Sequence, residues 1–299
     1  MKLSICVITM NRAAQLKKAL ESCLACELPK ETEFIVVDNA STDETEQVVN
    51  ETLGRCGYSY CYEKLTENLG VGGGRNYAYK MACGDYVYML DDDAVINHEN
   101  EPDFFLHAVK ILEEYQDIVT LTTQIYDVVW KKNRVEADGP KITSALYKCQ
   151  MFCGGSHFLR RSFYREPPYL SNKYGYEEIP PSLRAINTGK INAFCPKLLV
   201  THKPLINKWT YKDEESQALL VKGIALPYAI KKMMYPVSLL PLLKLAVNKR
   251  IRLYMTEVPN ASRRVKQTVK SFCEEYPIKE KIKLSTYLRM FKDFKLSVF

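Results

Sequence analysis

The chain has 299 residues, of which 46% are hydrophobic and 26% are charged, as is typical of a folded globular protein and not of a disordered one. Its 10 cysteines lack the dense spacing of a small secreted domain, so we expect reduced thiols in a cytosolic protein without a signal peptide. The formal net charge is +7, and the excess of basic residues lies in 231–299. A positive net charge of this kind would favour binding to an anionic membrane, an anionic substrate or nucleic acid.

The first hundred residues alternate short apolar runs with amphipathic patterns. We predict strands at 3–9, 34–37, 58–63 and 86–90, and helices at 13–26, from about 42 to 53 and at 73–83. The second helix is expected to start at a capping box, because Glu44 follows Ser41 at the required spacing. Strands and helices that alternate with short connections indicate a parallel sheet flanked by helices.

The middle of the chain is less regular. We predict a helix at 101–115, a strand at 118–126, a polar excursion at 127–145, a strand within 149–159, a short helix within 174–189 and a strand at 191–200. From residue 225 the composition becomes basic and helical. We therefore divide the chain into 1–95, 96–224 and an extension at 225–299.

The extension contains an apolar segment, 233–247, that is too short to span a bilayer and is interrupted by Pro236, Pro241 and Lys244. Basic residues flank it on both sides. Two interpretations stay open. The extension lies in a membrane interface as amphipathic helices, or its helices pack on the rest of the protein with their lysines in solvent.

Polar side chains follow the predicted strands at the points where these strands end. Asp91, Asp92 and Asp93 follow the fourth strand, while Thr9 and Asp38 close the first and second. In open α/β sheets, ligands bind beyond the carboxyl ends of the parallel strands. Adjacent carboxylates repel one another unless a cation neutralises them, and Mg²⁺ or Mn²⁺ with substrate phosphates would do so. A solvated acidic loop is the alternative interpretation.

A glycine-rich stretch from Gly70 to Arg75 precedes the third predicted helix. It is not a dinucleotide-binding fingerprint, because the third glycine of that motif would fall on Arg75, and it lacks the Gly-Lys-Ser/Thr of a P-loop. We interpret it as a loop that lets the backbone approach an anion, with Arg75 as a charged partner for a phosphate. A flexible turn would explain the glycines alone.

Four motifs resemble those of the family 2 glycosyltransferases in their order and spacing. They are ITMNR at 8–12, VVDNASTD at 36–43, NLGVGGGRN at 68–76 and GDYVYMLDDD at 84–93. The resemblance is specific over the first 95 residues, weakens over 100–150 and returns at about 150–202. It implies an α/β fold of GT-A type, with a Rossmann-like, mostly parallel sheet flanked by helices and a mainly helical C-terminal extension. Residues 1–95 would form the donor-binding half and 96–224 the acceptor-binding and catalytic half.

The resemblance also implies which residues surround a nucleotide diphosphate sugar. The expected donor-binding residues are Thr9, Asn11, Arg12, Asp38, Asn68, Gly70, Arg75, Asp91 and Asp92. Among them Asp38 would accept from the base, Arg75 would sit near the base or the diphosphate, and Asp91 would contact the ribose. In the family's DxD motif Asp93 would bind Mn²⁺ or Mg²⁺. His202 would be a third metal ligand or a contact to the diphosphate.

Inverting transfer of a sugar needs a general base that removes the proton of the acceptor hydroxyl. The resemblance places this base in the pair Glu177–Glu178, and we expect Glu178 to act, with Glu177 beside it. The opposite assignment stays open, because Pro180 and Pro181 follow where the family has a regular helix. A helix N-terminus that merely favours carboxylates is the structural alternative.

From these residues we predict a metal-dependent inverting glycosyltransferase that uses a nucleotide sugar, with a UDP-sugar favoured, and a glycan, lipid-linked or protein-linked acceptor. It would act in the cytoplasm, with peripheral contact to the inner face of the membrane through 231–299. The alternative is a catalytically inactive scaffold that binds a sugar nucleotide in a glycan assembly complex. Nucleic acid is disfavoured as a partner because the tail shows no recognised binding module.

Overall fold

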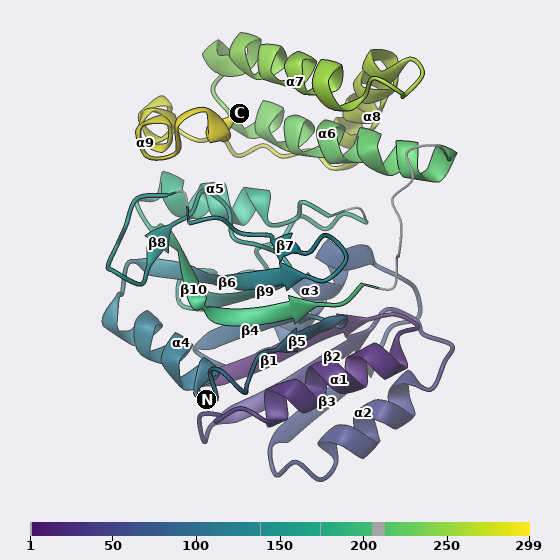
Figure 1. Ribbon diagram of the computed structural model, residues 1–299, viewed down its shortest axis with the longest axis vertical. Helices are drawn as coiled ribbons and strands as arrows, with labels where there is room; N and C mark the ends of the chain where they lie inside the picture. The colour runs from purple at the N-terminus through teal and green to yellow at the C-terminus, as the bar shows by residue number, and fades with distance from the viewer. Residues whose placement is uncertain (1, 138, 174, 205–212) are drawn as a thin grey trace. The chain divides into compact units, whose positions relative to one another are not determined.

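The computed structural model describes residues 2–137, 139–173, 175–204 and 213–299. The chain forms two compact units, Met1–Leu205 and Ile206–Phe299 (Figure 1). The first is an α/β unit built around one sheet, and the second consists of helices. The unit boundary therefore precedes the boundary predicted at 224/225, which lies inside the helix α6 (Glu214–Met234).

A ten-stranded sheet forms the centre of the α/β unit, and its main path runs β3-β2-β1-β4-β9-β6-β10-β5. Two short strands, β7 and β8, pair with β6 and β10 at its margin. The strands are β1 (Leu3–Thr9), β2 (Thr32–Asp38), β3 (Ser59–Lys64), β4 (Tyr86–Asp91), β5 (Ala94–Ile96), β6 (Ile118–Asp127), β7 (Lys132–Asn133), β8 (Tyr147–Lys148), β9 (Ser156–Arg160) and β10 (Ile191–His202).

The first half of the sheet, β3-β2-β1-β4, is parallel throughout, as the alternating pattern predicts. The second half is mixed, because β9 runs antiparallel between β4 and β6, while β10 is parallel to β6 and antiparallel to β5. The mostly parallel arrangement therefore holds for the N-terminal half. In the C-terminal half, β9 returns the chain beside β4 without a crossover helix.

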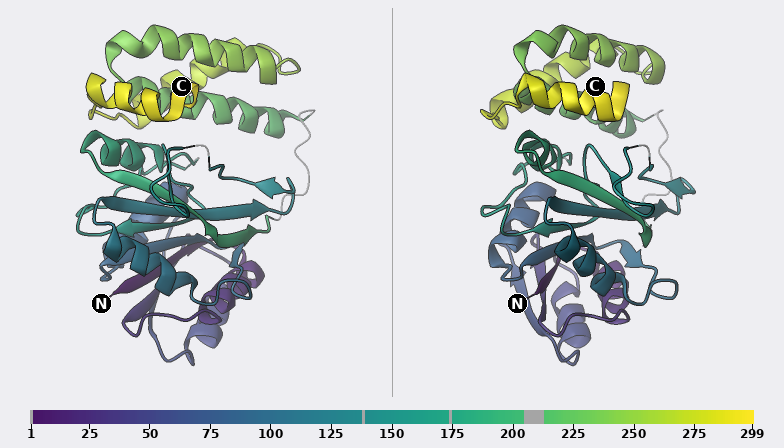
Figure 2. Two further views of the ribbon diagram at one scale, coloured as in Figure 1. Left: turned by 60° about the vertical axis from the view of Figure 1, so that its left-hand side comes forward. Right: turned by 90° about the vertical axis from the view of Figure 1, so that its left-hand side faces the viewer.

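Helices cover both faces of the sheet (Figure 2). One face packs on α1 (Ala13–Leu24), α2 (Thr45–Leu53) and α4 (Phe104–Glu114), and the other on α3 (Gly70–Met81) and α5 (Ile179–Asn187). The central strands β1, β2 and β4 are almost entirely buried because they are covered on both sides, which explains their continuous apolar sequences. This arrangement of a central sheet between helices is the α/β architecture that the sequence predicts.

The glycine-rich stretch is not a loop, contrary to the prediction. Gly70 to Gly74 form the first turns of α3, which starts three residues earlier than expected. A Cβ atom on Gly72 would lie 1.9 Å from the carbonyl oxygen of Leu170, and Gly70 has a φ of +73°. The glycines therefore allow the start of α3 to pack closely against the segment around 170–173, and they hold the helix near the sheet edge.

The capping box predicted for α2 is also wrong. The helix starts at Thr45, and Glu44 at the N-cap makes no side-chain capping bond. Asp43 provides the cap-like interactions, since its Oδ1 atom accepts a hydrogen bond from the Thr45 hydroxyl at 2.5 Å. Ser41 is used elsewhere, because its hydroxyl accepts a 2.8 Å hydrogen bond from the backbone N–H of Asn11.

The helical unit consists of α6, α7 (Leu240–Tyr254), α8 (Ala261–Glu275) and α9 (Leu284–Phe294), with the 3₁₀ turns η1 (Val237–Leu239) and η2 (Lys295–Val298). Its core is formed by side chains such as Leu226, Leu243, Val265 and Met290. The mainly helical extension is thus confirmed. Across the described ranges, the chain contains no helix that is both long and apolar enough to cross a bilayer.

Candidate functional site

Strand register brings the predicted site residues together at one edge of the sheet. Asp38 pairs with Thr9 across β1 and β2, and Asp91 pairs with Ile8 across β1 and β4. On the other half of the sheet His202 at the end of β10 lies opposite Ala94, the residue after Asp93. Residues far apart in sequence therefore meet where β1, β4 and β10 end.

A cavity of about 540 Å³ opens at this edge. Most of the predicted residues line it, namely Thr9, Arg12, Asn68, Gly70, Arg75, Asp91, Asp92, Asp93, Glu177, Glu178 and His202. Asn11 and Asp38 are not among the lining residues. The cavity is also lined by Asn39, which follows the second predicted strand, and by Arg134, Lys173 and Tyr176, which no sequence pattern indicates.

Asp91, Asp93 and His202 form a cluster of potential metal ligands. One ligand atom from each residue lies within 4.8 Å of the other two. His202 Nε2 is 3.1 Å from Asp93 Oδ1. Burial lowers the pKa of His202, but the adjacent Asp93 carboxylate outweighs it and the net shift is upward; the same pairing lowers the pKa of Asp93 despite its burial. Two carboxylates and an imidazole are suitable ligands for a divalent cation.

The opposite edge of the His202 ring contacts Asp127, a residue not predicted from the sequence. Asp127 is paired with His202 in the β6–β10 register, and its Oδ2 atom is 3.1 Å from His202 Nδ1. Arg134 donates to the same Asp127 oxygen at 2.6 Å, and its guanidinium lies over the ring of Trp130. A carboxylate behind a ligating histidine fixes the ring so that its other nitrogen faces the metal.

Asp92 is not one of the three clustered potential ligands, and its side chain is bound to Thr9 and Arg12. The Thr9 hydroxyl donates to Asp92 Oδ2 at 2.8 Å, and Arg12 Nη1 lies 2.9 Å from Asp92 Oδ1 and 3.0 Å from Asp93 Oδ2. Burial raises the pKa of Asp92 to about 6, although Arg12 and Thr9 act in the opposite direction. Thr9 and Arg12 thus hold the turn that carries Asp93.

Arg75 is predicted to lie near the base or the diphosphate, and in the structure its guanidinium is paired with two carboxylates. Its side chain is only 5% exposed and forms ion pairs with Glu177 through Nη1 and with Asp91 through Nη2, the latter at 2.6 Å. Because both ends of the guanidinium are bound to carboxylates, Arg75 joins the metal-type cluster to the glutamate pair. It does not present a free guanidinium to a diphosphate.

The two glutamates of the predicted catalytic pair have distinct environments. Glu177 is buried, is held by Arg75, and its Oε2 atom has no hydrogen-bond partner among the described residues. Glu178 is half-buried and faces the cavity, and burial followed by the neighbouring Glu177 raises its pKa to about 8. Pro180 and Pro181 occupy the first turn of α5, a position where proline is well tolerated, so they do not disrupt the helix.

Asp38 lies inside the protein, away from the cavity. Its Oδ1 atom accepts a 2.7 Å hydrogen bond from the backbone N–H of Ser41, and its Oδ2 atom accepts a 2.6 Å bond from the hydroxyl of Tyr62. Asn39, the next residue, lines the cavity, and its Oδ1 atom is buried without a hydrogen-bond partner in the described structure. Of these two neighbours, Asn39 is therefore the one that lies at the cavity, and its only sequence signal is its position after a buried strand.

Asn68 and Asn11 have local structural roles. Asn68 Oδ1 accepts a 2.7 Å hydrogen bond from the backbone N–H of Gly70 and so shapes the start of α3. Asn11 has a φ of 52°, and its side chain accepts a 2.7 Å bond from the backbone N–H of Thr42. This bond ties the β1–α1 connection to the segment that follows β2.

The fold and the site define a class of protein: a GT-A type α/β domain with a cluster of acidic residues and a histidine at the carboxyl ends of its strands. A comparison with protein families identifies it further. The model of the family described as "Glycosyl transferase family 2" matches residues 4–166, more than half of the chain. The chain therefore belongs to glycosyl transferase family 2, as the motifs predict.

Among known proteins the chain is similar to the poly(ribitol-phosphate) beta-N-acetylglucosaminyltransferase TarS of Staphylococcus aureus, with 34% identity over 122 residues, or 40% of this chain and 20% of the relative. It is also 34% identical over 92 residues to the GalNAc(5)-diNAcBac-PP-undecaprenol beta-1,3-glucosyltransferase of Campylobacter jejuni, covering 31% of this chain and 29% of that protein. These matches span less than a third of either relative's length.

Solved structures resemble the whole chain. TarS residues 1–349 in complex with UDP-GlcNAc superpose with a TM-score of 0.62 at 18% identity, covering 93% of this chain and 82% of the other. The mannosyltransferase PcManGT from Pyrobaculum calidifontis, in complex with GDP-Man and Mn²⁺, gives a TM-score of 0.59 at 17% identity over 100% of this chain and 81% of the other. At this identity the likeness establishes the fold.

Proposed function

We propose that the protein is a metal-dependent inverting glycosyltransferase that moves a sugar from a nucleoside diphosphate to an acceptor hydroxyl. The observation that carries the proposal is the presence of a cluster of potential metal ligands and a separate glutamate in one cavity. Asp91, Asp93 and His202 form the cluster, and Glu178 faces the same space. Such a pair of functions, one for the leaving group and one for the acceptor, is what an inverting displacement requires.

On the donor side, Asp93 and His202 would hold a divalent cation with Asp91, and Asn39 would contact the base. The cation would neutralise the charge that develops on the leaving diphosphate. Mn²⁺ accepts an imidazole ligand more readily than Mg²⁺, which prefers oxygen, so His202 favours Mn²⁺. A UDP-sugar is the favoured donor, and the UDP-GlcNAc bound to the similar TarS structure supports this choice.

On the acceptor side, Glu178 would remove the proton of the attacking hydroxyl. Its raised pKa of about 8 makes its carboxylate a stronger base than an ordinary glutamate. Glu177 would not act directly, because Arg75 holds its carboxylate. Instead, the ion pair between Glu177 and Arg75 would fix the backbone that carries Glu178. This stretch of backbone includes Gly175 and Tyr176, which both have positive φ angles.

The acceptor is proposed to be a glycan attached to a polymer or a lipid. Two relatives support this class by their names, which refer to poly(ribitol-phosphate) and to an undecaprenol-linked saccharide. A lipid-linked acceptor would bring the protein to the inner face of the cell membrane, where the helical unit would make the contact. In 206–299 there are 19 Lys and Arg residues against 8 Asp and Glu, a composition that attracts anionic lipid.

The surface of α7, α9 and η2 supports a membrane contact. Lys249 and Arg250 border a groove of about 830 Å³ on this surface. Exposed apolar side chains line the same groove, namely Leu242, Leu245, Leu253, Tyr254, Leu288, Phe291 and Leu296. A second copy of the chain would bring the same positive charge to the contact, since each copy contributes Lys249 and Arg250. An anionic bilayer offers both an apolar interior and the opposite charge.

A sugar-nucleotide-binding scaffold without activity is the less favoured function. Such a protein would have no need for a carboxyl group of raised pKa facing the cavity, and Glu178 provides one. The test is a panel of UDP-, GDP- and dTDP-sugars with Mn²⁺ or Mg²⁺, read as released nucleotide. Release from at least one donor, abolished in Asp93→Ala, supports the enzyme. Donor binding by calorimetry without release or transfer from any donor would support the scaffold.

A further inference from the structure

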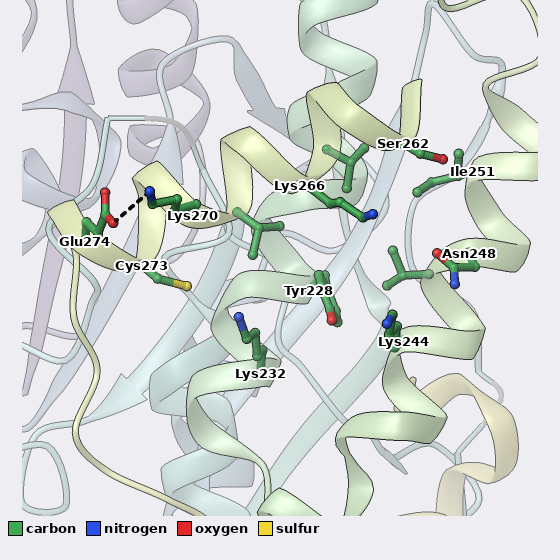
Figure 3. Close-up of a pocket in the computed structure, with 13 residues that line it drawn as sticks. Tyr228, Lys232, Lys244, Asn248, Ile251, Ser262, Lys266, Lys270, Cys273 and Glu274 are labelled. Atoms are coloured by element: carbon green, nitrogen blue, oxygen red, sulfur yellow. Dashed lines mark ion pairs between the residues drawn. The ribbon is translucent and has the colours of Figure 1, made fainter. Parts of the chain in front are cut away.

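The helical unit contains a second hollow, separate from the groove of α7 and α9. It lies between α6, α7 and α8 and has a volume of about 330 Å³ (Figure 3). Its floor is apolar, because Val247, Ile251, Val265 and Val269 are all at most 8% exposed. None of the residues of the α/β cavity belongs to it, so this hollow goes beyond the proposed glycosyl transfer.

Lysines from three different helices surround this apolar floor. Lys232 comes from α6, Lys244 from α7, and Lys266 and Lys270 from α8 (Figure 3). Glu274 is the only carboxylate among the described residues of the lining, and it lies 3.9 Å from Lys270. Within the described ranges, Lys232, Lys244 and Lys266 form no ion pair. Three exposed ammonium groups without an acidic partner around one hollow create a positive potential that attracts an anion.

The other polar groups of the lining can donate hydrogen bonds. Tyr228 and Ser262 contribute hydroxyl groups, and Asn248 contributes an amide (Figure 3). A hollow rich in donors and poor in free carboxylates suits the oxygens of a phosphate. The valine and isoleucine floor would in addition take up a hydrocarbon chain, which inorganic phosphate lacks.

We propose that the hollow formed by Lys232, Lys244 and Lys266 over this apolar floor binds a phosphate ester that carries a hydrocarbon chain. Two sources share this chemistry, the headgroup of an anionic membrane lipid and the phosphate of a lipid-linked acceptor. In both cases the ammonium groups contact the phosphate oxygens and the first methylene groups cover the valines. The protein would thus recognise a lipid phosphate at a site that is distinct from its donor cavity.

The first experiment uses the wild-type chain without donor or metal, so its outcome is independent of glycosyl transfer. Cys273 lines the hollow and is partly exposed, whereas Cys61 and Cys83 lie exposed in the α/β unit. Alkylation of all three thiols is followed by mass spectrometry with and without dihexanoyl phosphatidic acid below its micelle concentration. We expect the lipid to slow modification of Cys273 at least about threefold, because it covers the thiol, and to leave Cys61 and Cys83 unchanged.

The second experiment compares variants by calorimetric titration with the same lipid. In K232Q/K266Q two charge-assisted contacts are lost, so we expect binding to weaken by about tenfold or more. The matched control is Lys270→Gln. This variant loses a lysine of the same lining that is already paired with Glu274, so it should bind the lipid nearly as tightly as the wild type does. Circular dichroism verifies that each variant is folded; these lysines are exposed, and their substitution leaves the apolar floor intact.

Ligands that carry only one part of the chemistry complete the test. Inorganic phosphate provides charge without a chain, and dihexanoylglycerol provides the chains without a phosphate, so both should bind more weakly than phosphatidic acid. Tighter binding of farnesyl phosphate than of phosphatidic acid would assign the site to a lipid-linked acceptor, and the reverse order to a membrane lipid. Equal affinity of wild type and K232Q/K266Q, or unchanged alkylation of Cys273, would overturn the proposal.

Discussion

Nδ1 of His202 lies 3.1 Å from Oδ2 of Asp127, while Nε2 of the same ring lies 3.1 Å from Asp93. The imidazole is therefore held between two carboxylates, one on the cavity side and one behind it. Arg134 neutralises the rear carboxylate and keeps it in place. If His202 binds a cation through Nε2, its Nδ1 carries a proton that Asp127 can accept. Arg134 Nη2, which lies 3.0 Å from the same Nδ1, would then donate to Asp127 and not to the ring.

The first prediction concerns Asp127. In Asp127→Asn the charge behind His202 is lost while the shape is kept, so we expect Mn²⁺ affinity to fall about 10- to 100-fold. Titration of Mn²⁺ by electron paramagnetic resonance measures the effect. The control is Asp117→Asn, which removes an exposed carboxylate that pairs with Lys190. An unchanged Mn²⁺ affinity in Asp127→Asn would show that Asp127 does not orient a metal ligand.

The second prediction concerns pH. The pKa of His202 is raised, and a protonated imidazole cannot bind a metal. Mn²⁺ affinity should therefore fall as the pH is lowered through the pKa of His202, and binding should release a proton. Calorimetry in buffers of different ionisation enthalpy measures the released protons. In His202→Gln we expect weaker binding and fewer released protons, and an identical proton count in both proteins would contradict the assignment.

The third prediction concerns Glu178. The Glu178→Gln variant should lose sugar transfer while it still binds the donor, because its amide cannot accept the proton of the acceptor. In the wild type, kcat/KM should rise with pH toward about 8, the pKa to which burial raises Glu178. Single-turnover transfer and donor calorimetry test the two parts. Retained transfer in Glu178→Gln would move the role of base to another residue.

The fourth prediction concerns the stability of the same variant. The pKa of Glu178 is about 8 in the folded protein against an ordinary value of 4.5, so between these pH values the folded state binds more protons than the unfolded state. Because Glu178 ionises in the unfolded chain but stays largely protonated in the folded protein, the stability falls progressively as the pH rises from about 4.5 to about 8. Glu178→Gln removes this cost, and its Tm should exceed that of the wild type by an amount that grows over this range. Glu177→Gln, which weakens the ion pair with Arg75, should instead lower the Tm.

The fifth prediction concerns the apolar surface of α7 and α9. We expect L245S/L253S to bind vesicles that contain phosphatidylglycerol at least about tenfold more weakly than the wild type, since two exposed leucines no longer enter the bilayer. Co-sedimentation measures the bound fraction, and vesicles of phosphatidylcholine alone should bind less. The matched control is L106S/V128S, which removes two exposed apolar side chains from the α/β unit. If wild type and L245S/L253S sediment equally, this surface has a different partner; a concentration-dependent dimer of the wild type would identify that partner as a second copy.

Much of the α/β unit could be predicted from the sequence because its signals are local. Buried parallel strands have continuous apolar sequences, and the polar residues that end them, such as Asp91 and Asp93, must share one edge. Asp127 and Arg134 could not be found in this way. Asp127 reaches His202 only through the register of β6 against β10, and that pairing joins residues 75 positions apart, for which the sequence has no periodic signal.

The glycine-rich stretch was misassigned for a related reason. Local propensity favours a loop at Gly70 to Gly74, but close packing against the segment around Leu170 requires residues without a Cβ atom and holds them in a helix. The function of Arg75 was equally hidden, because its partners Asp91 and Glu177 are 16 and 102 residues away. Tertiary contacts therefore determine both the helical conformation of Gly70 to Gly74 and the ion pairs of Arg75.

The position of Arg75 between Asp91 and Glu177 links the two halves of the cavity energetically. Asp91 contributes to the raised pKa of Glu178, and a cation bound beside Asp91 would oppose that contribution. Loading of the donor with its metal would therefore draw a proton away from Glu178. By reciprocity, an ionised Glu178 would strengthen metal binding to the same extent. A bound donor with its metal would therefore favour the ionised form of Glu178, the form in which this side chain can accept a proton.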